Sequence, residues 1–454
     1  MFSSLEKPPV TFRAYNKDSI SAAKKIRRAG LCVMKYEWFL FDLDGTLAES
    51  GAGILNSARY ALTQLGAEIP PEEEMRAFIG PPLLWSFQNV AHLPEETARR
   101  AVELYRERYG REGWMETSIY PGVQELLRGI RRRGGKIALA SAKPQGFCEK
   151  ILAHFGLEKY FDRVSAISLT DHHPEKRDII LRALPEEADR ARAVMVGDRV
   201  YDIEGALQAG VTPVAAGYGY GNPGEFDRAA AVARAPRDLW DVLVGEARDP
   251  GRMVTFEGVD GSGKSTQFHL AVDYFRTRGW DVLSSREPGG CPISEKVREL
   301  ILDVANREMT PLCEAYLYAA ARAQHVAQVL RPALREGKLV LCDRFLDSSI
   351  AYQAYGRELT EPLIRQINKP AVDGLEPDLT LVYALPAAEA KRRVAQNGAP
   401  DRLEIEGLDF VGRVQAGYDA LAAAQPQRLI QVDSGRSIEA VFADTGRLIS
   451  RLLA

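Results

Sequence analysis

The chain has 454 residues, of which 46% are hydrophobic and 27% are charged, as is usual for folded globular domains. This length allows two or three domains that each bury a core. The formal net charge of -3 provides no basic excess of the kind that binding nucleic acid through phosphate contacts usually requires, whereas nucleotide substrates are compatible with it.

The five cysteines are scattered, odd in number and lack the paired spacing of a zinc site or a redox motif. A reducing cytoplasm is therefore the simplest expected location. No apolar run approaches the roughly 18 residues of a membrane span, so we expect no contact with a membrane.

Residues 1–35 are mixed in character and contain a basic cluster at 24–28. One reading is a targeting extension, because the segment has few acids, but its serine-rich and amphipathic features are weak. We favour either a disordered leader or a true start of translation at Met34, just ahead of the first expected strand.

From Trp38 onward, short apolar strands alternate with helical stretches, which is the pattern of a parallel sheet covered on both faces. The strands expected in this half are 38–41, 137–140, 164–167, 193–196 and 212–215. Residues 51–118 interrupt the alternation with successive helices, whose apolar residues recur at three-to-four spacing. We predict that this all-helical insert is a cap over an active site.

Residues 245–251 are polar and contain a Pro-Gly turn, so we predict that they link two domains. A second alternating series follows, with strands expected at 253–256, 281–285, 339–342, 379–383 and 428–432. The predicted fold class is α/β, with two doubly wound parallel-sheet domains at residues 36–244 and 252–454.

Polar residues follow the expected strands of the first half, where open parallel sheets place their ligands. Together these residues offer carboxylates for magnesium and for attack on phosphorus, and a hydroxyl and an amine for phosphoryl oxygens. Solvated acidic strand ends are the alternative, but like charges this close repel unless a cation or a proton compensates them. The residues are Asp42, Asp44, Ser141, Lys176, Asp198 and Asp202.

These motifs resemble those of the haloacid dehalogenase superfamily of phosphatases over about residues 38–244. The resemblance implies a Rossmann-like core in which Asp42 is the nucleophile that forms an aspartyl phosphate, and Asp44 is the general acid and base. It also implies phosphate binding by Ser141 and Lys176.

The same resemblance implies that magnesium is held by Asp42, the Asp44 carbonyl and Asp198, with Asp202 close by. The cap and the stretches IYPGVQELL and GYGYGNPGEF are similar to the phosphoglycolate phosphatase and 5'-nucleotidase branch. This branch implies a small phosphate ester, such as a nucleotide or phosphoglycolate, as substrate. The alternative is that this half is a non-catalytic interaction module.

Residues 257–267, EGVDGSGKSTQ, fit the phosphate-loop pattern between an expected strand and an expected helix. The glycines let N–H groups converge on phosphate oxygens, and the helix N-terminus adds partial positive charge. Lys264 would contact the outer phosphates, and the Ser265 hydroxyl would ligate magnesium. The expected nucleotide-binding residues are Gly258, Val259, Asp260, Gly261, Ser262, Gly263, Lys264, Ser265 and Thr266.

Three further motifs, SREPGG, EAYLYAAARAQHV and CDRFLDSSIAYQ, suit a nucleoside monophosphate acceptor. Arg286 and Arg344 can neutralise its phosphate, because guanidinium matches phosphate oxygens in a bidentate fork. Tyr318 offers a flat face for a base, and Arg322, four residues further along the helix, can donate to a carbonyl of that base.

These motifs resemble thymidylate kinase over about residues 252–454. The resemblance implies transfer of the ATP γ-phosphoryl group to dTMP with magnesium, and a homodimer formed through this half. Another nucleoside monophosphate, or a nucleotide-binding switch, is the alternative. The dTMP-site residues that it implies are Asp260, Arg286, Tyr318, Arg322, Asp343, Arg344, Ser349, Tyr352 and Gln353.

Some thymidylate kinases carry a basic residue inside the phosphate loop, where this chain has Gly261 and Ser262. The lid stretch 391–404 contains several arginines that can supply the charge instead. We expect Arg393 or Arg402 to act with Lys264 and Arg344 in catalysis. The alternative for any one lid arginine is a solvated basic helix face.

Overall fold

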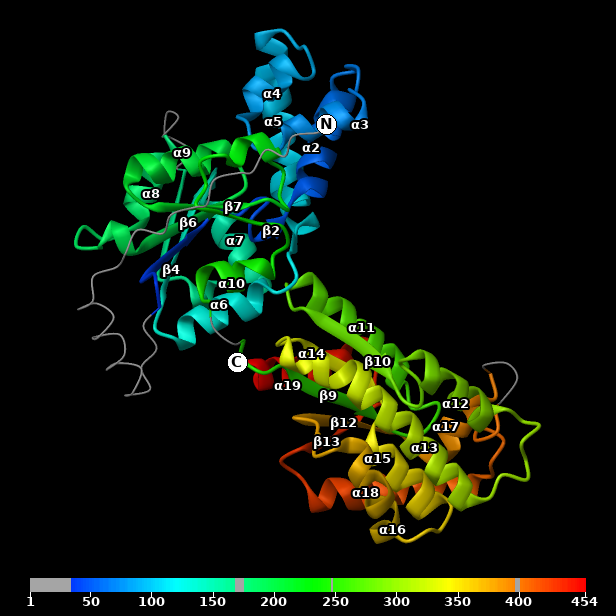
Figure 1. Ribbon diagram of the computed structural model, residues 1–454. Helices are drawn as coiled ribbons and strands as arrows, with labels where there is room; N and C mark the ends of the chain where they lie inside the picture. Colours follow the sequence, from blue (N-terminus) through cyan, green and yellow to red (C-terminus); the bar gives the residue numbers. More distant parts are fainter. Residues whose placement is uncertain (1–33, 168–174, 246–247, 397–400) are drawn as a thin grey trace, which may run out of the picture.

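The computed structural model describes residues 34–167, 175–245, 248–396 and 401–454 (Figure 1). They form two α/β units, each with its own parallel sheet. The expected leader lies outside the described residues except for its last two positions. Within the described residues, no helix combines the length and the apolar character that crossing a bilayer requires.

The N-terminal sheet has the strand order β5-β4-β1-β6-β7-β8, and all neighbours are parallel. β1 is buried along its whole length, which is typical of a central parallel strand covered by helices on both faces. The strands are β1 Trp38–Phe41, β4 Lys136–Pro144, β5 Arg163–Ile167, β6 Ala193–Gly197, β7 Thr212–Ala216 and β8 Ala231–Ala233.

Helices cover both faces of this sheet. One face packs against Leu126, Ile151 and Trp240, and the other against Ile179 and Ala206. These helices are α6 Val123–Arg132, α7 Gln145–Phe155, α8 Lys176–Ala183, α9 Val200–Ala209 and α10 Asp238–Leu243.

The helical cap has its own core. In α5 the buried residues Ala98, Ala101, Tyr105 and Tyr109 recur at helical spacing among charged positions. The cap helices are α2 Gly51–Gln64, α3 Glu72–Met75, α4 Leu83–Asn89 and α5 Glu95–Arg111. The chain enters and leaves the cap through two short antiparallel strands, β2 Ala48–Glu49 and β3 Ser118–Ile119. These two strands and β8 were not expected from the sequence.

The C-terminal sheet has the order β10-β11-β9-β12-β13 and is also parallel. Its strands are β9 Arg252–Glu257, β10 Val282–Arg286, β11 Leu339–Asp343, β12 Leu379–Ala384 and β13 Leu429–Asp433. All five lie within one or two residues of the expected positions, which confirms the predicted fold class.

The helices α11 and α19 share the core on one face of this sheet through residues such as Phe275 and Ile449. A π-helical stretch, Ile350–Gly356, follows α15 and packs with α18 on the other face. The helices are α11 Lys264–Thr277, α12 Pro292–Leu302, α13 Pro311–His325, α14 Arg331–Arg335, α15 Leu346–Ser349, α16 Glu361–Val372, α17 Ala387–Val394, α18 Leu408–Ala424 and α19 Ile438–Leu453.

Candidate active sites

The carboxylates expected in the first half meet at one edge of the N-terminal sheet. Phe41, the last residue of β1, pairs with Leu139 of β4 and with Val196 of β6, so the residues that follow these three positions lie side by side. Carboxylate oxygens of Asp42, Asp198 and Asp202 lie within 4.8 Å of one another, and all three residues are buried.

Lys176 joins this cluster from the start of α8. Its Nζ lies 2.8 Å from Asp42 Oδ1 and 2.5 Å from Asp202 Oδ1. Burial disfavours the ammonium, but the carboxylates of Asp202 and Asp42 outweigh it and raise the pKa of Lys176. The predicted grouping of Asp42, Asp198, Asp202 and Lys176 therefore exists in the structure.

Burial is the main cause of the raised pKa values of Asp42 and Asp198. It raises the pKa of Asp42 to about 6, with further contributions from Asp202 and Asp44, although Lys176 opposes the shift. Burial and the charges of Asp202 and Asp42 raise the pKa of Asp198 to about 8. A buried set of carboxylate oxygens that repel one another is a fitting donor set for Mg²⁺, which prefers oxygen ligands.

A lysine missed by the sequence analysis holds Asp44. Lys143 Nζ lies 2.9 Å and 3.0 Å from the two oxygens of this carboxylate, and Ser50 Oγ donates to it at 2.6 Å. Lys143 also lies over the Tyr109 ring of the cap, 4.9 Å from its centroid. The sequence carries a signal for it, because Lys143 stands two residues after Ser141 and alternate strand residues share a face.

Ser141 is buried at the same edge of the sheet, and its Oγ accepts a hydrogen bond from the N–H of Lys143 at 3.3 Å. Two contacts nearby join the core to the cap. Arg199 Nη1 donates to the Ile79 carbonyl at 2.8 Å, and Gly51 N donates to the Tyr220 hydroxyl at 2.8 Å. The cap therefore lies against the loops that carry the carboxylates.

In the second half, the phosphate-loop residues 258–263 lie between β9 and α11. Gly261 has φ of +81°, and a Cβ there would lie 2.3 Å from the Ala390 carbonyl oxygen, so only glycine suits this turn. Lys264 opens α11 and forms an ion pair with Asp343 at the end of β11. Ser265 Oγ lies 3.5 Å from the other oxygen of Asp343. A lysine, a hydroxyl and a carboxylate thus lie together at the helix N-terminus.

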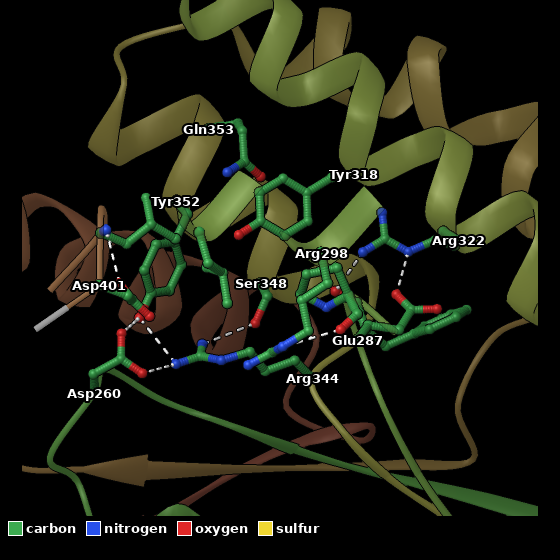
Figure 2. A pocket seen from close by; sticks show the side chains of 14 residues that line it. Asp260, Glu287, Arg298, Tyr318, Arg322, Arg344, Ser348, Tyr352, Gln353 and Asp401 are labelled. Atoms are coloured by element: carbon green, nitrogen blue, oxygen red, sulfur yellow. Dashed lines mark hydrogen bonds and ion pairs between the residues drawn. The ribbon is translucent and has the colours of Figure 1, made fainter. Parts of the chain in front are cut away.

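A pocket opens beside this loop, and Figure 2 shows the Tyr318 and Tyr352 rings and the guanidinium groups of Arg322 and Arg344 around it. Its empty volume is about 520 Å³, including the part open to solvent. The lining residues are Asp260, Glu287, Pro288, Arg298, Leu302, Tyr318, Arg322, Arg344, Phe345, Ser348, Tyr352, Gln353, Asp401 and Leu403.

Arg344 links the phosphate loop to this pocket. Its guanidinium forms an ion pair with Asp260 of the loop and donates to the Tyr352 hydroxyl at 3.1 Å, and that hydroxyl donates to Asp260 at 2.9 Å. Burial would raise the pKa of Asp260, but Arg344 and Lys264 outweigh it and lower the pKa. The backbone of Arg344 is left-handed, with φ of +70°, a strained conformation that is common at functional sites.

Arg322 is almost fully buried behind the pocket. It donates to Glu287 at 2.7 Å, to Ser349 at 3.0 Å, to the Phe345 carbonyl at 3.0 Å and also to Asn368. These bonds leave one of its five N–H hydrogens without a partner among the described residues. Glu287 was missed, although it belongs to the SREPGG motif.

Three residues expected at the acceptor site do not line the pocket. Arg286 is exposed and bonded to Glu295 at 2.9 Å, Ser349 lies behind Arg322, and Asp343 lies beside Lys264. Arg298 of α12 lines the pocket, where Arg286 was expected. No sequence signal distinguishes Arg298 from other charged residues on an amphipathic helix.

The two candidate lid arginines have different surroundings. Arg402 is buried, 2.5 Å from Glu314 and 2.6 Å from the Ile301 carbonyl. Arg393 lies beside the phosphate loop, since its Nη1 would be 4.0 Å from a Cβ on Gly263. Residues 397–400 of the expected lid lie outside the described residues.

Comparisons with known proteins agree with this division of the chain. Residues 256–445 match the family described as thymidylate kinase, and residues 39–216 match the family described as haloacid dehalogenase-like hydrolase. The chain is 47% identical over 204 residues to thymidylate kinase of Pelotomaculum thermopropionicum, covering 45% of this chain and 94% of that relative. It is 46% identical over 191 residues to thymidylate kinase of an Exiguobacterium species, covering 42% of this chain and 90% of the relative.

Solved structures resemble each half. A haloacid dehalogenase-like family hydrolase from Streptococcus pneumoniae is 26% identical, with 46% of this chain and 98% of that chain covered and a TM-score of 0.43. Thymidylate kinase from Ehrlichia chaffeensis is 32% identical, with 44% of this chain and 99% of that chain covered and a TM-score of 0.36.

Proposed function

Because the C-terminal half of this chain belongs to the thymidylate kinase family and its N-terminal half to the haloacid dehalogenase-like hydrolases, we propose a two-site enzyme that moves phosphoryl groups. In this proposal residues 252–454 transfer the ATP γ-phosphoryl group to dTMP, giving dTDP and ADP. Residues 36–244 hydrolyse a small phosphate ester.

The observation that carries the kinase proposal is the position of Asp260, which belongs to the phosphate loop and also lines the acceptor pocket. Two bound nucleotides would therefore meet at Asp260, where Arg344 lies ready to neutralise the acceptor phosphate. Lys264 would neutralise the phosphates of ATP. Bound Mg²⁺ would offset further phosphate charge, with Ser265 and Asp343 as the nearest oxygen donors.

The polar groups of the pocket suit a pyrimidine base. Tyr318 presents a ring for stacking, and the Arg322 N–H that has no partner among the described residues can donate to a carbonyl of thymine. Gln353 donates to Glu314 at 2.9 Å, which leaves its Oε1 without a hydrogen-bond partner in the described part of the chain. This oxygen can accept from the N–H of thymine. A buried acceptor is costly when it is unpaired, so the pocket favours a base that donates there.

The test of the kinase proposal is ADP formation from ATP with one acceptor at a time. We expect dTMP to be used faster than dUMP, dCMP or dGMP. Equal rates with all four acceptors would reject the assignment and favour a general nucleotide kinase or a nucleotide-binding switch.

For the N-terminal half, the proposed reaction begins when an oxygen of Asp42 forms a bond to phosphorus and the ester P–O bond breaks. Asp44 gives a proton to the departing alkoxide and later takes one from the water that releases phosphate from Asp42. Lys176 and Ser141 would hold phosphoryl oxygens, and Lys143 would position Asp44. Mg²⁺, when bound by Asp42, Asp198 and the Asp44 carbonyl, with Asp202 close by, would offset the charge of the phosphate.

The observation that carries this proposal is the contact of Asp42 with both Lys176 and the acidic cluster. The assay is phosphate release from a panel of nucleotides and phosphoglycolate with Mg²⁺. Asp42→Asn should abolish release while ADP formation by the other half continues. Release that survives this substitution would reject the nucleophile, and no turnover of any ester by the wild-type chain would favour the interaction module.

We also propose that the kinase half forms a homodimer. Apolar side chains on α12 and α13 are strongly exposed, including Ile293 at 56%, Leu300 at 53% and Tyr316 at 56%. Exposed apolar side chains on neighbouring helices fit a self-complementary surface. Light scattering should give twice the chain mass, and a monomer at micromolar concentration would contradict the proposal.

A further inference from the structure

The two halves share a junction in which each satisfies backbone groups of the other. Helix α6 of the N-terminal half begins at this junction, and two N–H groups at its start donate to the Gly279 carbonyl, from Gly122 at 2.9 Å and from Gln124 at 3.3 Å. In return, the Asp281 N–H donates to Glu125 Oε1 at 3.0 Å. The first N–H groups of a helix need outside acceptors, so this arrangement is a helix cap supplied by the other domain.

Side chains tighten this junction. Arg128 lies over the Trp280 ring, 5.1 Å from its centroid, and donates to the Leu453 carbonyl at 3.2 Å. Gly279 has φ of +85°, and a Cβ there would lie 2.3 Å from Ile119 Cγ2. Both Arg128 and Trp280 are buried. The halves are therefore packed against each other, in addition to being joined by the linker.

On the phosphatase side, the junction includes the hinge of the cap. Ile119 of β3 pairs with Ala48 of β2 and also forms a bridge with Arg278 of the other half. The chain passes between core and cap only through β2 and β3. Ser50, directly after β2, donates to the Asp44 carboxylate at 2.6 Å. A displacement of β2 and β3 would therefore move both the cap and the Ser50 hydroxyl that bonds Asp44.

On the kinase side, the junction lies at the end of the helix that begins at the phosphate loop. Helix α11 runs from Lys264 to Thr277, and Arg278 and Gly279 follow it directly. Its 14 residues span roughly 21 Å as one rigid element. In Figure 1 this helix extends from the kinase sheet toward α6 and α10 of the other half.

We propose that α11 couples the two sites, so that nucleotide binding at the phosphate loop shifts the opening of the phosphatase cap. The effect is reciprocal by thermodynamic linkage, so a ligand that closes the cap also changes nucleotide affinity. The functional value of this coupling rests on the two proposed activities. The coupling itself can be tested without measuring either activity.

The first test follows hydrogen exchange in the full chain, with and without adenosine 5'-(β,γ-imido)triphosphate and Mg²⁺. The nucleotide should change exchange at the phosphate loop and also in residues 117–124. Arg128→Ala and Glu125→Ala should abolish the second change and keep the first. Arg131→Ala is the matched control, because Arg131 lies on the same helix but bonds Asp162 within its own half. Its response should equal that of the wild type.

The second test uses p-nitrophenyl phosphate as the phosphatase probe at saturating nucleotide analogue. We expect its kcat/KM to change by about 5-fold or more in the wild type and in Arg131→Ala, and to stay constant in Arg128→Ala. Exchange that changes at the phosphate loop but not at 117–124 would overturn the coupling and leave both proposed activities standing. A chain that hydrolyses no ester would refute the phosphatase, while the exchange data would still decide the coupling.

Discussion

Removal of Arg402 should mainly lower the stability of the kinase half, whereas removal of Arg393 should mainly lower its catalytic rate. Arg402 is 6% exposed in its side chain and bonds the buried carboxylate of Glu314 at 2.5 Å. Breaking a buried ion pair costs about 3–5 kcal/mol, because a buried charge stays behind. Arg357 still lies 3.2 Å from Glu314, so we expect Arg402→Ala to lower the free energy of unfolding by about 3 kcal/mol, at the lower end of this range.

Arg393 is 35% exposed and pairs with Glu389 on the helix surface, a contact that solvent screens and that therefore contributes little to stability. Arg393 lies beside the phosphate loop. The substitution Arg393→Ala should therefore lower kcat of the kinase by about 100-fold or more, which is the usual effect of losing one donor to the transferred phosphoryl group. Arg392→Ala is the control, since Arg392 also pairs with Glu389 but is 64% exposed. It should keep wild-type kcat.

The assay measures ADP formation with dTMP at saturating substrates, and the kinase activity that remains after incubation in increasing urea. Arg402→Ala should lose activity at lower urea and keep most of its kcat in buffer. A normal urea midpoint for Arg402→Ala together with a greater loss of kcat than in Arg393→Ala would refute this division of roles.

Three further outcomes follow from the sites and the junction. Burial raises the pKa of Glu125 to about 8, although the hydrogen bond from the Asp281 N–H and the charge of Arg128 oppose the shift, so the native chain keeps a proton that the unfolded chain releases near pH 4.5. The free energy of unfolding should therefore fall between about pH 5 and 8, by at most about 1.4 kcal/mol per pH unit, and Glu125→Gln should flatten this slope in thermal melts. Asp249 and Glu336 also line this region, so a slope that persists in the glutamine variant would assign the proton to another group. Removing Mg²⁺ with a chelator should abolish both activities, and adding Mg²⁺ back should restore them; a phosphatase that works in chelator would contradict the carboxylate site. Tyr352→Phe removes the hydroxyl between Arg344 and Asp260 and should raise KM for dTMP with a stability loss of about 1 kcal/mol, whereas an unchanged KM would place the acceptor elsewhere.

The sequence carries more information about where strands end than about which groups long side chains contact. Asp42 and Asp198 lie together because parallel strands end at a common edge, and this rule needs only the positions of the strands. Lys176 reaches them from the start of α8. Lys143 follows the same rule and was overlooked. The pocket beside the phosphate loop was predicted through Tyr318 and Arg344, whose motifs lie at the end of a strand or on a helix that faces it.

The surroundings of Arg298, Arg402 and Glu314 depend instead on which helices pack together. Arg402 reaches Glu314 across 88 positions of the sequence, and neither residue stands in a pattern that separates it from surface charges. The two-residue strands β2 and β3 were missed for a similar reason, because a pair this short has no periodicity and forms only when the cap folds back on the core.

The absence of a side chain at Gly279 has a practical consequence for the construction of chimeras from these domains. Glycine is required at this position of the kinase half for two reasons, its own left-handed φ of +85° and the Ile119 methyl group of the other half, which lies 2.3 Å from the Cβ that any other residue would carry. A different kinase grafted onto this phosphatase would need a side-chain-free turn after its first helix. In a chimera with any other residue at this position, each domain could fold, but the two domains would not pack against each other.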